Sequence, residues 1–240
     1  MELPFERGTR RRIYLMRHGE AAYVGGDGQL TRDPLATPLS ARGRREAAAM
    51  GELLGPVHFD RAVCSGLART VQTAELVLHD KRLPLERVPD LEEVRGGRGR
   101  AVPIEPRDIA DCMWELARPG GRFLGGESLV ELQARVMGAV ERLVAQPGWK
   151  HLLLVAHGGV NRVILAWALG APLESAPHME QDSGCLNVID LDHDADSGKL
   201  IRTFVRALNV TAADPAKHER WLTTLEQQAK DFEGAFRPRN

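Results

Sequence analysis

Short runs of branched apolar residues alternate along the chain with longer segments in which apolar residues recur every three or four positions. The short runs are typical of strands that are buried on both faces of a sheet. There are four of them: residues 13–16 (IYLM), 61–64 (RAVC), 151–156 (HLLLVA) and 186–191 (LNVIDL). We expect these strands to form one central, mostly parallel sheet.

Four longer segments have the period of a helix with one apolar face. They are residues 40–55, 67–78, 128–144 and 160–169. In the first, Ser40 is expected to cap the helix and Gly55 to end it. Strands that alternate with such helices predict an α/β fold, a three-layer sandwich in which helices flank the sheet on both faces.

The chain becomes more polar after Val205, and residues 214–232 are predicted to form one surface helix. Its expected anchors are Trp221, Leu222 and Leu225. We interpret residues 1–240 as a single domain with a core of about 11–206 and a C-terminal helical extension, 207–240. No chemistry is assigned to this extension.

Composition narrows the possible partners. A net charge of -1, with 43% hydrophobic and 27% charged residues, argues against a general binder of nucleic acid or membrane. No apolar run approaches ~20 residues, so a cytoplasmic location is expected. The three cysteines are far apart, which indicates neither a disulfide framework nor a zinc site. A small-molecule partner is therefore expected, while the oligomeric state stays open.

Candidate chemistry is concentrated where three of the predicted strands end. Ligands of open α/β sheets bind beyond the carboxyl ends of strands. The strand ends read RHGE (17–20), CSGLARTVQTAE (64–75) and AHGGVNR (156–162). Their histidines and arginines would converge on a volume the size of a phosphate group, since arginine forks bind phosphate oxygens in pairs. A core histidine satisfied by hydrogen bonds is the alternative for either motif alone, but the two motifs together favour a ligand site.

At this point the sequence resembles a known family, the histidine phosphatase superfamily, also called phosphoglycerate mutase-like. The resemblance covers roughly residues 13–191 and rests on six segments in the family's order. These are LMRHGE (15–20), PLSARGRREA (38–47), CSGLARTVQTAE, LEE (91–93), GGES (125–128) and VAHGGVNR (155–162).

The resemblance implies a phosphomonoester hydrolase that acts on a small phosphorylated metabolite without a metal or other cofactor. His18 would be the nucleophile that forms a phosphohistidine, and Glu93 would protonate the departing alcohol. The implied substrate-binding residues are Arg17, Arg69, His157 and Gly158. The arginines and a protonated histidine would supply the positive charge that the transferring phosphoryl group needs. Glu92, beside Glu93, is the alternative acid.

Two departures from the family pattern bear on the substrate. The family often has threonine and asparagine where this chain has Ala21 and Val24, so one polar phosphate contact is in question. The loop after Glu93 carries three arginines that either meet a second anionic group or form a solvated basic loop. They are Arg95, Arg98 and Arg100.

Three other functions remain as alternatives. A phosphoglycerate mutase is disfavoured because Val94 and Gly96 stand where such mutases carry arginine and tyrosine. A cysteine-dependent phosphatase is disfavoured because Cys64 and Arg69 are one residue too close for a backbone loop to ring the phosphate. A catalytically silent sensor of phosphorylated ligands stays open because of Val24.

Overall fold

The computed structural model describes residues 8–26, 28–31, 33–97 and 105–236. One sheet of six strands has the order β3-β2-β4-β1-β5-β6. Neighbours from β3 to β1 pair in parallel, whereas β5 and β6 join antiparallel, which confirms a mostly parallel sheet. The strands are β1 (Gly8–Arg17), β2 (Arg61–Cys64), β3 (Leu85–Arg87), β4 (His151–Ala156), β5 (Leu186–Asp194) and β6 (Leu200–Val210).

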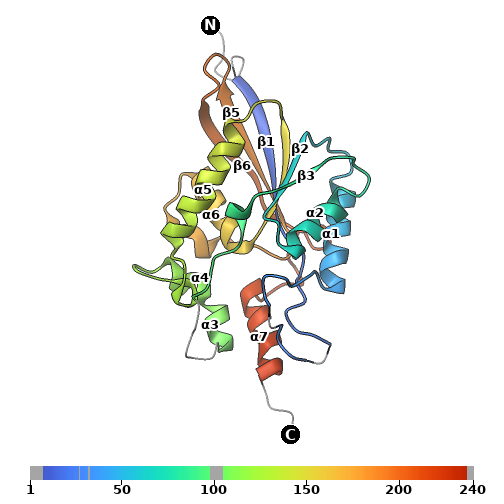
Figure 1. The fold of residues 1–240 in the computed structure, drawn as a ribbon, viewed down its shortest axis with the longest axis vertical. Helices are drawn as coiled ribbons and strands as arrows, with labels where there is room; N and C mark the ends of the chain where they lie inside the picture. The colour runs from blue at the N-terminus through green and yellow to red at the C-terminus, as the bar shows by residue number, and fades with distance from the viewer. Residues whose placement is uncertain (1–7, 27, 32, 98–104, 237–240) are drawn as a thin grey trace.

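Helices cover both faces of this sheet, with α1 and α2 on one side and α5 and α6 on the other (Figure 1). The predicted three-layer α/β sandwich is confirmed. The α-helices are α1 (Ala41–Leu53), α2 (Ala68–Val77), α3 (Pro106–Ala110), α4 (Cys112–Ala117), α5 (Leu129–Ala145), α6 (Gly158–Leu169) and α7 (Thr224–Phe236). Short 3₁₀ turns are Pro89–Leu91, Phe123–Gly125 and Leu173–His178.

Strand β1 is buried on both faces, as its apolar run predicts. Ile13 and Leu15 belong to the core cluster that includes α5 and α6. Tyr14 and Met16 belong to a second cluster, under α1 and α2. Because successive side chains of a strand point to opposite faces, one short segment supports both layers.

Strand β1 begins at Gly8, five residues before the predicted apolar run. The added residues are polar because they pair with charged residues of β5. Arg10 Nε lies 2.6 Å from Asp192 Oδ1, and Arg12 Nε lies 2.6 Å from Asp190 Oδ1. Direct cross-strand pairs of opposite charge stabilise a sheet, and they escape a search for apolar runs.

The predicted helix over 214–232 is wrong in its first half, since α7 begins at Thr224 and residues 214–223 form turns and bends. Lys217 has a φ of 60°, a left-handed conformation that ends any helix there. Trp221, expected as an anchor, is 92% exposed. Strand β6 also continues to Val210, beyond the polar transition at Val205.

The short helices α3 and α4 lie between the loop after Glu93 and the start of α5. A capping box begins α5, in which Ser128 Oγ accepts from Glu131 N and the Glu131 carboxylate accepts from Ser128 N. At α1, the predicted Ser40 cap is confirmed by a 3.0 Å bond from Gly43 N. Within the described ranges, no helix has the length and apolar character needed to cross a membrane.

Candidate active site

Sheet register brings the three predicted strand ends together. Arg17 of β1 lies opposite Ala156 of β4, and Cys64 of β2 lies opposite Val155 of the same strand. The chain therefore leaves three adjacent strands at one edge of the sheet, where His18 and His157 come together. Their ring centroids are 5.1 Å apart, in an edge-to-face arrangement.

His18 is 3% exposed and its tautomer is fixed by its own loop. Nδ1 lies 2.6 Å from the carbonyl oxygen of Gly19, which only accepts, so Nδ1 carries the proton. Nε2 then carries the lone pair, which accepts a hydrogen bond from Arg69 Nε at 3.2 Å. Burial lowers the pKa of His18 well below 6.5, and the charges of Arg69 and Arg17 lower it further. A neutral imidazole whose second ring nitrogen is unprotonated is a nucleophile.

His157 lies beside this ring, fully buried, with its Nε2 2.9 Å from the hydroxyl of Ser65. Its Nδ1 has no hydrogen-bond partner among the described residues. Burial lowers the pKa of His157 well below 6.5, and the neighbouring His18 and Arg69 lower it further. Desolvation therefore favours the neutral form of His157, and the positive charge expected on it beside a phosphoryl group stays a prediction.

These two lowered pKa values make stability depend on pH. The unfolded chain protonates both histidines below a pH of about 6.5, whereas the folded chain keeps them neutral. The free energy of unfolding should therefore fall as pH decreases below about 6.5, by up to about 1.4 kcal/mol per pH unit for each histidine. Denaturant unfolding between pH 7.5 and 5.5 measures this slope. The substitution His157→Gln should reduce the dependence of the free energy of unfolding on pH, whereas His79→Gln, at an exposed position, should leave it unchanged. Equal slopes for the wild type and His157→Gln would contradict the assignment.

Two buried arginines flank Gly158 at the start of α6. Arg17 Nη1 donates to the carbonyl of Gln181 at 2.5 Å, and Arg162 Nη2 lies 3.1 Å from Glu180 Oε2. A Cβ added to Gly158 would lie 3.1 Å from Arg162 Nη1 and 3.5 Å from Arg17 Nε. Both Nε atoms are buried without a partner in the described part of the chain. Unpartnered buried donors of two cations favour an anion beside them.

Arg162 was not predicted as a site residue. It lies in the VAHGGVNR segment, where the periodicity predicts only a helix with one apolar face. The structure buries it to 3% exposure inside α6, and burial lowers its pKa. The sequence signal is the position of Arg162, directly before the apolar stretch VILAWAL. Arginine is rarely buried unless it is paired or binds a ligand.

Glu93 reaches the same helix terminus from the loop after the 3₁₀ turn Pro89–Leu91. Both of its carboxylate oxygens lie 3.2 Å from Gly159 N, and Oε1 also accepts from Val94 N at 3.0 Å. Arg135 holds the loop by donating to the carbonyl of Glu92 at 2.9 Å. The Glu92 carboxylate instead faces Arg95 at 3.5 Å. Of the two candidate acids, only Glu93 contacts the α6 terminus.

The remaining predicted residues do not join this cluster. Arg95 is exposed, and Arg98 and Arg100 lie outside the described residues. Cys64 is buried at the end of β2, where burial raises the pKa of its thiol, so it lacks the accessible thiolate of a cysteine-dependent phosphatase. No group of three or more histidine, cysteine or acidic side chains within the described ranges is arranged to hold a metal ion.

A neutral imidazole at a strand tip, surrounded by arginines, a helix N-terminus and a carboxylate, is a site for a phosphoryl group. Comparison with known proteins gives the same class. A profile of the histidine phosphatase superfamily (branch 1) matches residues 13–203. The chain belongs to this superfamily and is a phosphoric monoester hydrolase of the histidine phosphatase kind.

Similar proteins include an adenosylcobalamin/alpha-ribazole phosphatase of Escherichia coli, 34% identical over 191 residues, which cover 75% of this chain and 90% of the relative. A probable phosphoglycerate mutase of Proteus mirabilis is 31% identical over 164 residues, 67% of this chain and 75% of the relative. Among solved structures, a mycobacterial glucosyl-3-phosphoglycerate phosphatase matches with a TM-score of 0.68 and 26% identity, covering 84% and 99% of the two chains.

Proposed function

We propose that this protein hydrolyses small phosphomonoesters with His18 as the covalent nucleophile. The lone pair of His18 Nε2 attacks phosphorus, the bond from phosphorus to the alcohol oxygen breaks, and the oxygen takes a proton from Glu93. The alcohol leaves, and the phosphoryl group stays on Nε2. Arg17 and Arg69 stabilise the charge on its oxygens.

Water completes the reaction. It attacks phosphorus while the Glu93 carboxylate accepts its proton, and the electron pair of the phosphorus–nitrogen bond returns to Nε2. Inorganic phosphate leaves and both residues regain their starting protonation states. His157 and Gly158 contribute nitrogen atoms next to the phosphoryl group, and Arg162 contributes a further charge beside Gly158.

The observation that best supports this proposal is the protonation state of His18. Its Nδ1 proton is held by the Gly19 carbonyl at 2.6 Å, so Nε2 presents its lone pair beside Arg69. The attacking atom and the positive charge that stabilises the transferred group are therefore arranged before a substrate binds. This is electrostatic preorganisation, which supplies a large share of catalysis in such sites.

A product assay separates hydrolysis from its alternatives. We expect release of inorganic phosphate from generic phosphomonoesters, with no phosphoryl transfer between the hydroxyls of phosphoglycerate. The mutase alternative rests on the similarity to a probable phosphoglycerate mutase. Interconversion of phosphoglycerates faster than phosphate release would establish that alternative, and absence of turnover on every ester would leave the sensor function.

A further inference from the structure

A cavity of about 700 Å³ opens beside His18 and Arg17. Two of its walls come from residues 20–24 and 182–183, and the third comes from residues 219–232. This third wall lies outside residues 13–203, the part that the superfamily profile matches. We call residues 211–233 the C-terminal wall. Its place next to the proposed nucleophile gives a role to the segment that sequence reasoning left without one.

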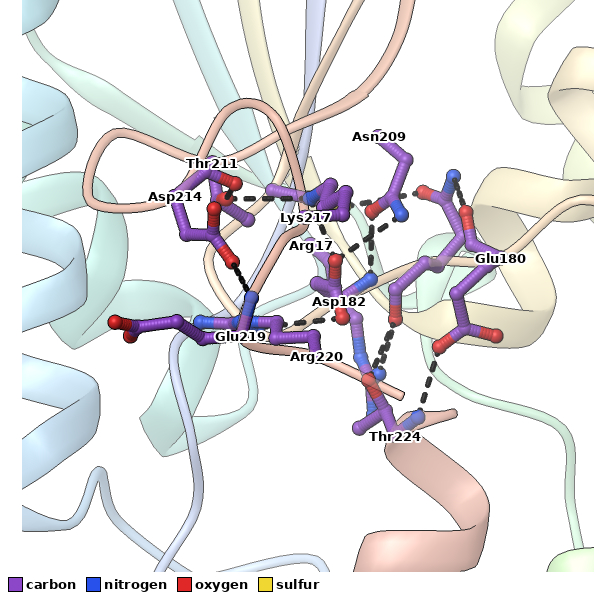
Figure 2. Close-up of polar contacts among 12 residues, drawn as sticks. Arg17, Glu180, Asp182, Asn209, Thr211, Asp214, Lys217, Glu219, Arg220 and Thr224 are labelled. Carbon is purple, nitrogen blue, oxygen red and sulfur yellow. Dashed lines mark hydrogen bonds and ion pairs between the residues drawn. The ribbon is translucent and has the colours of Figure 1, made fainter. Parts of the chain in front are cut away.

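A buried carboxylate holds the C-terminal wall in place (Figure 2). Asp182 is 4% exposed and lies 2.6 Å from Lys217 Nζ and 3.2 Å from Arg220 Nη1. It also accepts from Asn209 Nδ2 at 3.1 Å. The hydrogen bond and charge of Lys217, with the charge of Arg220, lower the pKa of Asp182 despite its burial. A buried, fully partnered carboxylate fixes the position of the groups around it.

The loop of residues 180–182 joins this wall to the phosphate site. The carbonyl oxygen of Gln181 accepts both from Arg17 Nη1 and from Thr224 Oγ1, the latter at 3.3 Å. Glu180 accepts from Thr224 N with one oxygen, at 2.9 Å, and from Arg162 with the other. The first residue of α7 and the two buried arginines therefore share the same anchoring groups, as Figure 2 shows for Arg17 and Thr224.

The charges around the cavity disfavour a second anionic group on the substrate. Apart from Arg17, its cationic residues are already paired with carboxylates: Arg42 lies 3.3 Å from Glu20, and Arg220 contacts Asp182. The carboxylates of Glu219 and Asp231 also line the cavity. An added substrate carboxylate would meet more negative than positive charge in the cavity, and like charges repel.

Three aromatic side chains line the cavity. Trp221 lines it while remaining 92% exposed. Tyr23 and Phe232 make an edge-to-face contact with centroids 6.2 Å apart. Ala21 and Val24, the departures from the family pattern, also line the cavity. An exposed tryptophan at the edge of a substrate cavity offers a stacking surface to a planar ring.

We propose that the C-terminal wall selects the alcohol part of the substrate, and that this part is uncharged and carries a planar ring that stacks on Trp221, as in a nucleoside. This inference rests on the proposed phosphatase function. It identifies the substrate class as ring-bearing alkyl phosphates without a second acidic group, and it identifies Trp221 as a residue that determines specificity without taking part in the chemistry.

A matched pair of substrates tests the stacking. Adenosine 5′-monophosphate and ribose 5-phosphate share the same primary alkoxide leaving group and differ in the ring. Trp221→Ala should lower kcat/KM for adenosine 5′-monophosphate about 10-fold, mainly through KM, and change it less than about twofold for ribose 5-phosphate. Trp114→Ala is the control, because Trp114 is also an exposed tryptophan but does not line the cavity. It should change neither value.

A second pair tests the charge. The wild-type protein should hydrolyse glycerol 3-phosphate with a higher kcat/KM than 3-phosphoglycerate, which differs by one carboxylate. The inference would be overturned if Trp221→Ala lowered kcat/KM equally for both ribose esters or for neither. A wild-type preference for 3-phosphoglycerate over glycerol 3-phosphate would also overturn it. These results leave the phosphatase function intact if His18→Ala still removes turnover. Failure of the wild-type protein to hydrolyse any of the four esters would instead overturn the proposed function.

Discussion

His18→Ala is expected to abolish both turnover and phosphoenzyme formation. The variant lacks the imidazole of His18, whose Nδ1 donates to the Gly19 carbonyl while its unprotonated Nε2 lies beside Arg69. Without it the reaction loses its covalent route, because the neighbouring His157 is fully buried and its Nε2 is engaged with Ser65. Quenched reactions with phosphorus-labelled substrate measure this directly, since a phosphohistidine is labile in acid and stable in alkali.

The control for this experiment is His79→Ala. His79 is an exposed histidine at the end of α2, where it lies 2.9 Å from Asp80. It should retain wild-type labelling and turnover. Labelling of His18→Ala at the wild-type rate would show that another residue is the nucleophile. Circular dichroism of both variants separates loss of the nucleophile from loss of the fold.

The parts of the site that follow strands were predictable from sequence. An apolar run such as residues 13–16 has to be buried on both faces, so the polar residues that end it lie at the edge of the sheet. Parallel strands end at a common edge of the sheet, so the sequence predicts that Arg17, His18 and His157 lie in one site. The α/β sandwich follows from the same alternation of strands and helices.

Residues positioned by long-range polar contacts were not predictable in this way. Asp182 and Lys217 are 35 positions apart in the sequence, and their contact holds a segment, residues 214–223, that the local pattern predicts as helix. Arg162 lies in a helix most of whose residues are buried, and its contact with Glu180 holds it beside Gly158. Such pairs depend on register between distant segments, and local periodicity carries no information about it.

The choice between two adjacent glutamates was also open from sequence and is sharpened by geometry. Glu93 contacts Gly159 at the start of α6, and Glu92 faces Arg95. A Cβ at position 159 would lie 2.6 Å from Glu93 Oε1, so a side chain there would displace the Glu93 carboxylate. The close approach indicates that the carboxylate and the helix terminus are adapted to each other.

Glu93→Gln should therefore impair phosphoryl transfer from alkyl phosphates far more than transfer from p-nitrophenyl phosphate. An alkoxide is a strong base and needs a proton as it leaves, so removing the acid should cost about 10²–10⁴ in rate. The p-nitrophenolate ion is a weak base and needs little help. The measurement is the single-turnover burst, because Glu93 also assists the water step and its loss slows steady-state turnover of both substrates.

Two further variants make this prediction specific. Gly159→Ala should reproduce the selective defect in weaker form, because its methyl group displaces the Glu93 carboxylate without removing it. Glu92→Gln should leave both bursts unchanged, since its carboxylate contacts Arg95 and not the α6 terminus. Equal burst defects on the two substrates in Glu93→Gln would contradict the acid role. A selective defect in Glu92→Gln alone would assign the role of general acid to Glu92. Only the group that protonates the leaving oxygen affects a strongly basic leaving group more than a weakly basic one.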